Sequence, residues 1–185
     1  MTKFDELHDL KDEMENDDSL PLKKGADKLV FGSGNTEAKI LLIGEGPGRN
    51  EDLQGIPFVG QAGKLLDKLL ALAGLERKNV FITNIVHHRP PENRDPLPNE
   101  IEAYGKYLDK IIEIIKPKII ITLGRFSMAK FLPDVFISQV HGKSFKVDEF
   151  TIIPMYHPAA SLRNGKILEA EKADFVNLKD MLQSI

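Results

Sequence analysis

Cysteine is absent from this chain of 185 residues, and so are long apolar runs. The lack of cysteine excludes disulfide bonds, thiolate catalysis and metal centres held by cysteine. The longest apolar runs, such as residues 119–123, fall far short of the ~20 residues that a membrane-spanning helix needs. The acidic segment 1–6 lacks the basic and then apolar order of a signal peptide. We therefore expect a cytoplasmic protein without a membrane partner.

A strong excess of charge of either sign is also missing, because the formal net charge is −3 at pH 7. Proteins that bind nucleic acid through their overall charge are usually strongly basic, so this balance argues against that class. It leaves room for an enzyme that contacts a few phosphates locally. The length and the hydrophobic fraction of 42% fit one domain with a sizeable core, over residues 1–185, and we expect a monomer.

Short segments rich in Ile and Val predict four buried strands, at residues 39–43, 79–83, 118–123 and 150–155. Helices are predicted at residues 63–73, from a cap at Asn99 up to Pro117, at 125–131 and at 169–182. This alternation indicates an α/β fold, a three-layer αβα sandwich with a central four-stranded, mainly parallel sheet. Residues 135–146 are predicted to form a loop or a small hairpin.

Three unusual segments follow predicted strands. They are residues 44–48 (Gly-Glu-Gly-Pro-Gly), 84–98 (from Asn to Pro, rich in proline) and 156–160 (Tyr-His-Pro-Ala-Ala). In folds of this type the functional crevice lies beyond the carboxyl ends of the strands. Glycine, proline and polar groups gathered at one edge of the sheet therefore predict a site there.

The glycine-rich segment 44–48 is either a tight turn or a loop that contacts a ligand. It lacks the spacing of a dinucleotide fingerprint and the Gly-Lys-Ser/Thr end of a phosphate-binding loop. Glu45 is the informative residue. A carboxylate between glycines allows close approach of a substrate and can orient or activate a water molecule.

Asn84 and His157 each have a structural and a functional interpretation. Asn84 is either a turn former or a carboxamide that pairs with the edge of a base. His157 follows an apolar strand and precedes a proline, which suits a neutral imidazole aimed at developing negative charge, although a lone histidine is more often structural. The adjacent His87 and His88 have no metal-ligand spacing to each other, to His141 or to His157, so no metal site is expected.

Taken in order, these segments resemble the motifs of the uracil-DNA glycosylase superfamily, and they look most like its family 4 of bacteria and archaea. The first motif corresponds to residues 44–52 and 55–66, the second to Asn84 with residues 89–96, and the rest to 123–124, 141–142 and 156–164. The likeness runs from about residue 30 to residue 164. Three motifs at the right intervals are far more specific than any one of them.

The resemblance implies a monofunctional enzyme of base excision repair, which hydrolyses the N-glycosidic bond of uracil flipped out of single- or double-stranded DNA. It implies that Phe58 stacks on the uracil, that Asn84 reads its O4 and N3 edge, and that His157 donates a hydrogen bond to O2. Glu45 would position the attacking water or stabilise the cationic sugar. A second layer of contacts must lock the Asn84 amide, because a freely rotating amide could also satisfy cytosine.

The resemblance implies further contacts around the base and the DNA. Gly44 and Gly46 would border the base. Leu162 and Arg163 would fill the vacated stack and hold a phosphate, although ordinary loop residues are an equal alternative at these two positions. No lysine is placed as a Schiff-base nucleophile, so simple hydrolysis without strand cleavage is expected.

The chain departs from family 4 where that family has the cysteines of an iron-sulfur cluster. The positions at or near those cysteines hold Asp17, Leu20, His88 and Tyr104. None of these side chains replaces a thiolate, so we expect a colourless protein without a cofactor, in which packing holds the N-terminal segment. Gly46 also stands where the family usually has alanine, and Gly48 is too small to exclude the methyl group of thymine.

Two other hypotheses stay open. The chain could be a catalytically weak or inactive homologue that only binds DNA or a base, or an unrelated nucleotide-binding α/β enzyme. The first leaves a histidine directed at O2 without a purpose, and the second leaves the Asn84 and His157 motifs unexplained. The glycosylase interpretation makes one spatial prediction, that Glu45, Phe58, Asn84 and His157 converge on one pocket.

Overall fold

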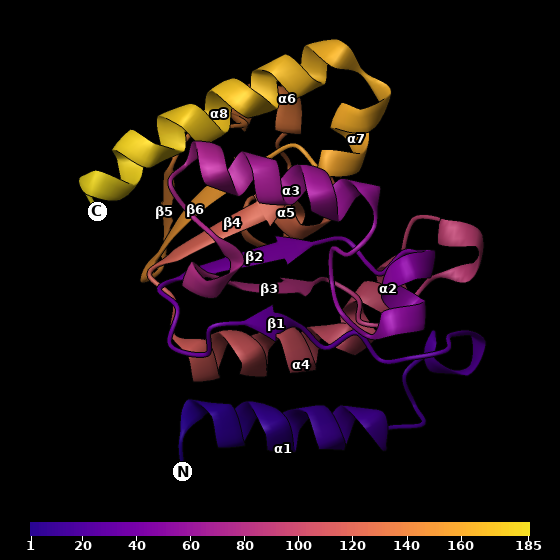
Figure 1. Cartoon of the computed structure of the whole chain (residues 1–185). Coiled ribbons are helices and arrows are strands. Elements are labelled where there is room, and N and C mark those ends of the chain that lie inside the picture. Colours follow the sequence, from indigo (N-terminus) through magenta and orange to yellow (C-terminus); the bar gives the residue numbers. More distant parts are fainter.

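The centre of the structure is a sheet whose four inner strands are parallel and apolar (Figure 1). A computed structural model describes all residues, 1–185. The inner strands are β3 (Phe81–Asn84), β2 (Ile40–Gly44), β4 (Ile119–Leu123) and β6 (Phe150–Met155), in that spatial order. Nearly all of their residues are buried, as expected for a sheet covered on both faces. The α/β class and the parallel centre are therefore confirmed.

The prediction of four strands is wrong, because the sheet has six. β1 (Ser33–Gly34) and β5 (Phe145–Val147) add antiparallel edges next to β3 and β6. Two or three residues are too few to show an apolar period, and β1 ends on a glycine that pairs with Phe81. β5 lies in the predicted loop or hairpin and forms a tight hairpin with β6.

Helices cover both faces of the sheet, which confirms the three-layer arrangement (Figure 1). On one face α3 (Gln61–Leu72), α7 (Pro158–Arg163) and α8 (Gly165–Gln183) lie over a core that includes Leu42 and Ile121. On the other face α4 (Pro98–Ile115) and α5 (Arg125–Phe131) lie over Leu41 and Ile43, and α1 (Lys3–Glu15) packs outside α4. Short elements complete the chain: α2 (Arg49–Gln54), α6 (Ile137–Val140) and the 3-10 turns η1 (Lys23–Gly25), η2 (Arg77–Asn79) and η3 (Pro91–Asn93).

Local capping sets the helix boundaries and corrects the predicted ones. The cap of α4 is Leu97 and not Asn99, because the Glu100 carboxylate accepts the Leu97 N–H at 2.8 Å and Pro98 suits the first helical position. α8 begins at Gly165, earlier than predicted, because the Asn164 side chain accepts the backbone N–H groups of the first turn. None of the helices combines the length and the apolar character needed to cross a bilayer.

Candidate active site

A cavity of about 530 Å³ opens at the carboxyl ends of the parallel strands. Six of the eight residues predicted for the site line it: Glu45, Gly46, Phe58, Asn84, His157 and Arg163. Gly44 lies behind this lining, against Asn84 and Phe58. Leu162 lies outside the cavity lining and is 52% exposed. The structure thus brings together the four chemical groups that come from distant parts of the chain.

Asn84 is the last residue of β3 and pairs with Gly44, the last residue of β2. Its side chain is buried, yet its Oδ1 has no hydrogen-bond partner in the protein. A buried acceptor without a partner costs about 1–3 kcal/mol, so an unpaired carboxamide oxygen in a folded protein needs an explanation. Asn84 lines the cavity, so its carboxamide has hydrogen-bonding capacity that the protein itself leaves unused.

Gly44 gives Asn84 and Phe58 the space that they occupy. A Cβ atom at position 44 would lie 2.5 Å from Asn84 Oδ1 and 2.7 Å from Phe58 Cζ. The predicted lock on the Asn84 amide is not a hydrogen bond from a neighbouring side chain, because Oδ1 receives none. Oδ1 and the edge of the Phe58 ring both border the space that a Cβ atom at position 44 would fill. Close packing at this point requires glycine.

The Phe58 ring lies close to His157, with ring centroids 5.6 Å apart and planes inclined by 28°. Phe58 is mostly buried but lines the cavity, and its backbone φ is +53°, which is unusual for a bulky residue. An aromatic face, a carboxamide and an imidazole thus share one region of the cavity wall. This combination can hold a flat heterocycle by stacking and by hydrogen bonds along its edge.

His157 caps α7, and this contact determines its tautomer. Its Nδ1 accepts the Ala159 N–H at 3.0 Å, so Nδ1 carries no proton. Burial, assisted by the positive charge of Arg163, lowers the pKa of His157 to about 4. At neutral pH the imidazole is therefore uncharged, with its proton on Nε2. The site holds a neutral N–H donor of the kind that stabilises developing negative charge.

Glu45 is partly exposed at the cavity wall, in the loop that leaves β2. Burial raises its pKa, and the negative charge of Asp95 adds to this effect, while Arg125 and Arg163 act in the opposite direction. The Glu45 carbonyl accepts the Val86 N–H at 3.1 Å, which ties this loop to the loop after β3. A carboxylate in this position can accept a proton or orient a water molecule.

Sequence reasoning missed the charged rim of the cavity. Arg125, at the start of α5, donates to Asp95 at 2.8 Å, and both residues line the cavity. Arg94 and Glu51 line it as well. Arg125 directly follows the turn after β4, so the rule that places sites at strand ends could have found it. Arg94 and Asp95 lie in segment 84–98, and Glu51 lies in the first motif at residues 44–52, but nothing in the sequence gave them separate roles.

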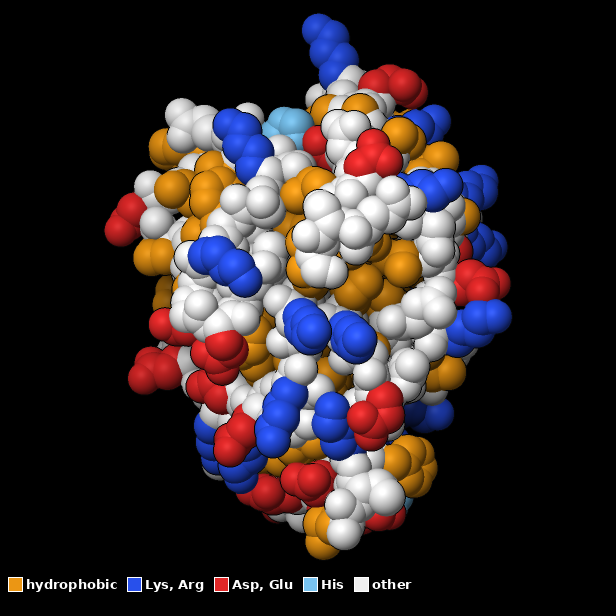
Figure 2. Space-filling model, turned by 90° about the vertical axis from the view of Figure 1, so that its left-hand side faces the viewer, with side chains coloured by type: hydrophobic (Ala, Val, Ile, Leu, Met, Phe, Trp, Pro, Cys, Tyr) orange, Lys and Arg blue, Asp and Glu red, His pale blue; other side chains and the backbone are white.

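The end of the molecule opposite the cavity carries a group of Lys and Arg side chains (Figure 2). Figure 2 views the amino ends of the strands, where Lys and Arg side chains gather in the middle and lower part. Lys39 and Lys118 are exposed there at the starts of β2 and β4, and their backbones are hydrogen bonded to each other. Neither lysine lines the cavity.

His87 and His88 are buried structural residues. His87 Nε2 lies 3.1 Å from Thr83 Oγ1, and His88 Nδ1 lies 2.6 Å from the Tyr104 hydroxyl. Burial is the main cause of their lowered pKa values, about 3 for His87 and about 4 for His88. Both side chains are enclosed in the protein rather than exposed in the cavity.

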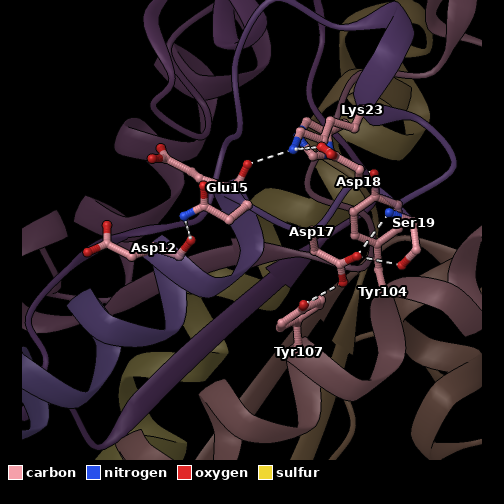
Figure 3. A network of polar contacts seen from close by, with 10 residues as sticks. Asp12, Glu15, Asp17, Asp18, Ser19, Lys23, Tyr104 and Tyr107 are labelled. Atoms are coloured by element: carbon pink, nitrogen blue, oxygen red, sulfur yellow. Dashed lines mark hydrogen bonds and ion pairs between the residues drawn. The ribbon is translucent and has the colours of Figure 1, made fainter.

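The residues at or near the positions where the resemblance places cluster cysteines do not fit an iron-sulfur cluster. Asp17 accepts hydrogen bonds from Ser19 and from the Tyr107 hydroxyl, the latter at 2.5 Å (Figure 3). These bonds hold the pKa of the Asp17 carboxyl well below its usual range. Leu20 is a buried apolar side chain, and His88 is bonded to Tyr104. The segment after α1 is thus tied to α4 by side chains that include hydrogen-bonded polar groups as well as the expected packing.

The fold and the site together define an α/β protein with a cavity at the carboxyl edge of a parallel sheet, lined by groups that can hold a flat, hydrogen-bonding ring. Comparison with known families gives a definite assignment. The chain belongs to the uracil DNA glycosylase superfamily, whose family model matches residues 31–180.

Curated relatives cover nearly the whole chain. The type-4 uracil-DNA glycosylase of Archaeoglobus fulgidus is 42% identical over 96% of this chain and 94% of its own length. The type-4 enzyme of Sulfurisphaera tokodaii is 42% identical over 96% of this chain and 86% of its own. That of Saccharolobus solfataricus is 43% identical over 98% of this chain and 88% of its own. The predicted resemblance to this superfamily is confirmed.

Proposed function

We propose that this protein is a uracil-DNA glycosylase, which cleaves the N-glycosidic bond of a uracil that has left the DNA stack. One observation carries the proposal: the unpaired, buried acceptor of Asn84 lies beside Phe58, and Phe58 lies beside a neutral His157. Uracil has complementary groups, because it offers a flat face, an N3–H donor, and acceptors at O4 and O2. The family and its relatives support the same activity.

Recognition rests on the orientation of the Asn84 amide. In the proposed complex Oδ1 accepts the N3–H of uracil and the amide nitrogen donates to O4. Cytosine has an acceptor at N3 and a donor at C4, so it meets the same amide with both groups reversed. A site with buried polar groups rejects a ligand that leaves those groups unpaired. Discrimination against cytosine therefore depends on the amide keeping this orientation.

Bond cleavage leaves the electron pair of the glycosidic bond on the uracil, which departs as an anion with charge at O2. In the proposed mechanism His157 Nε2–H donates to O2 and stabilises that charge. Glu45 holds the attacking water and accepts its proton as the oxygen bonds to C1′ of the cationic sugar. The uracil anion then takes a proton from solvent. The proposed reaction is hydrolysis without strand cleavage.

DNA contacts are proposed for the rim of the cavity. Arg163 lines the cavity and Leu162 is exposed next to it at the end of α7. We assign Arg163 to a phosphate of the flipped nucleotide, and Leu162 to the space that the uracil leaves in the stack. The protein is proposed to do this as a monomer.

The test uses oligonucleotides with one uracil, single-stranded and paired with guanine or adenine. After incubation, alkali breaks the strand at abasic sites. The wild-type protein is expected to give breakage at the uracil, while Asn84→Ala and His157→Ala lose most of it. Lys118→Ala and His8→Ala are matched controls, because both residues are exposed and far from the cavity lining. Retained DNA binding without breakage on any substrate would favour the non-catalytic homologue instead.

A further inference from the structure

The backbone at Phe58 has a conformation that is unfavourable for this residue type. Its φ of +53° lies in the left-handed region, which is unfavourable for a bulky side chain. Such a conformation persists only when surrounding contacts hold it in place. The contacts that hold Phe58 therefore determine where its ring lies in the cavity.

Arg77 holds the carbonyl side of this turn from outside the cavity. Its guanidinium donates to the Pro57 carbonyl at 3.1 Å, to the Phe58 carbonyl, and to the Gly63 carbonyl at 3.4 Å. Asp67 orients the guanidinium by accepting from Nε at 2.5 Å. Several donors in a fixed plane are a property of arginine that lysine lacks. One side chain from η2 thus fixes consecutive carbonyls of the turn.

Glu51 holds the amide side of the same turn. Its Oε2 accepts the Val59 N–H at 2.9 Å and the Gly60 N–H at 2.8 Å, and its Oε1 accepts the Gly48 N–H at 3.0 Å. The carboxylate therefore joins the turn after Phe58 to the glycine-rich loop after β2. The Phe58–Val59 peptide is therefore bound on both sides, its carbonyl by Arg77 and its N–H by Glu51.

Neighbouring residues pack closely against both the backbone and the ring of Phe58. A Cβ atom on Gly63 would lie 1.9 Å from the Phe58 carbonyl oxygen, so the first turn of α3 presses directly on this peptide. At the other end, the ring edge packs against Gly44. A change in the backbone at Phe58 would consequently move the ring relative to Asn84 and His157.

We propose that Arg77 and Glu51 are positioning residues, which keep Phe58 in the orientation that stacks on the substrate base. The catalytic part of this inference rests on the proposed function, whereas the effect on the ring does not. Arg77 is informative because its side chain is 30% exposed and lies outside the cavity lining. Its removal leaves the cavity wall chemically unchanged.

The experiment is a double-mutant cycle with Arg77→Ala, Phe58→Ala and both changes together. Arg77→Ala is expected to lower kcat/KM for uracil excision roughly tenfold, and to weaken inhibition by free uracil by a similar factor. In the Phe58→Ala background Arg77→Ala should have almost no further effect, because it acts through that ring. An equal loss in both backgrounds would overturn the inference. Lys78→Ala, in the same turn, is the matched control, because its only ion pair is with exposed Glu76.

A second measurement reports on the ring without using activity. Protein labelled with 4-fluorophenylalanine gives a fluorine spectrum in which Phe58→Leu identifies the Phe58 signal. Arg77→Ala should shift or split that signal, Arg77→Lys should do so less, and Lys78→Ala should leave it unchanged. An unchanged Phe58 signal in Arg77→Ala would refute the positioning role. If the wild-type protein excises no uracil, the proposed function fails, and this spectrum still decides whether Arg77 sets the ring.

Glu51→Gln and Asp67→Asn provide milder changes if Arg77→Ala does not fold. Glutamine keeps the shape of Glu51 but offers one acceptor oxygen instead of two. Asp67→Asn weakens the contact that orients Arg77 while leaving Arg77 in place. Each should lower activity and shift the Phe58 signal in the same direction as Arg77→Ala, with a smaller size. Activity loss without any change in the Phe58 signal would contradict the inference.

Discussion

The protonation state of His157 can be tested most directly. Its Nδ1 accepts the Ala159 N–H and its pKa is lowered to about 4. With that value, roughly one molecule in a thousand carries an imidazolium at pH 7. The donor to O2 is therefore a neutral Nε2–H in nearly every molecule. We expect no loss of activity as the pH rises from 6 to 8, where an ordinary histidine would lose its charge.

The two functions of His157 can be distinguished by comparing the loss of activity with the loss of stability in one variant. His157→Ala removes the donor to O2. This is expected to raise the activation free energy by about 3 kcal/mol and so to lower the single-turnover rate more than a hundredfold. It also removes the cap of α7, at a cost of about 1 kcal/mol in the free energy of unfolding. The loss of activity should therefore far exceed the loss of stability measured by denaturant unfolding.

The assay is single-turnover excision between pH 5 and 9, combined with nitrogen NMR of the imidazole. The spectrum should show an unprotonated Nδ1 and a protonated Nε2 across this range. His8→Ala, on the outer surface of α1, is the control for removal of an exposed histidine. A rate that falls as pH rises through 6–7, with loss of a second ring proton, would show that the charged form is active and refute the reasoning.

Three further predictions concern other parts of the molecule. Burial and Asp95 raise the pKa of Glu45, and the carboxylate is the active form in the proposed mechanism. Excision should therefore fall as the pH drops through this raised pKa. Glu45→Gln should abolish that dependence together with most activity. Gly44→Ala should abolish excision, because its Cβ would overlap Asn84 and Phe58. The control Gly105→Ala, in an open position of α4, should keep activity and raise the free energy of unfolding by about 1 kcal/mol. Tyr107→Phe removes the hydrogen bond to Asp17 and should lower the free energy of unfolding by about 1–2 kcal/mol, measured by thermal or denaturant unfolding. Excision should be unchanged, and equal losses of stability and activity would contradict this.

The inner sheet was predictable because its apolar runs are continuous. Ile119–Leu123 has no polar face, which indicates a strand covered on both sides. The edge strands β1 and β5 were not predictable, because two or three residues carry no period. Their pairing depends on the neighbouring strands already being in place.

The site was predictable where its residues follow strands. Asn84 ends β3 and His157 follows β6, and parallel strands bring their carboxyl ends to one edge. The contacts that fix Phe58 were not predictable, because Arg77 reaches carbonyls 19 and 20 positions earlier in the chain. Nothing about an isolated arginine in a short turn indicates that partner. Roles that depend on a tertiary contact of this kind need coordinates.

The hydrogen bond between Ala159 and His157 has a consequence for mutational surveys. The decisive group at position 159 is a main-chain amide, so changing the side chain there leaves the bond intact. A scan that replaces residues with alanine cannot register it, since the position is alanine already. An ester in place of that amide, or proline at 159, would delete the donor and free the imidazole to exchange its tautomers. The rate of uracil excision would then depend on the backbone N–H of residue 159, although the side chain there has no direct part in the reaction.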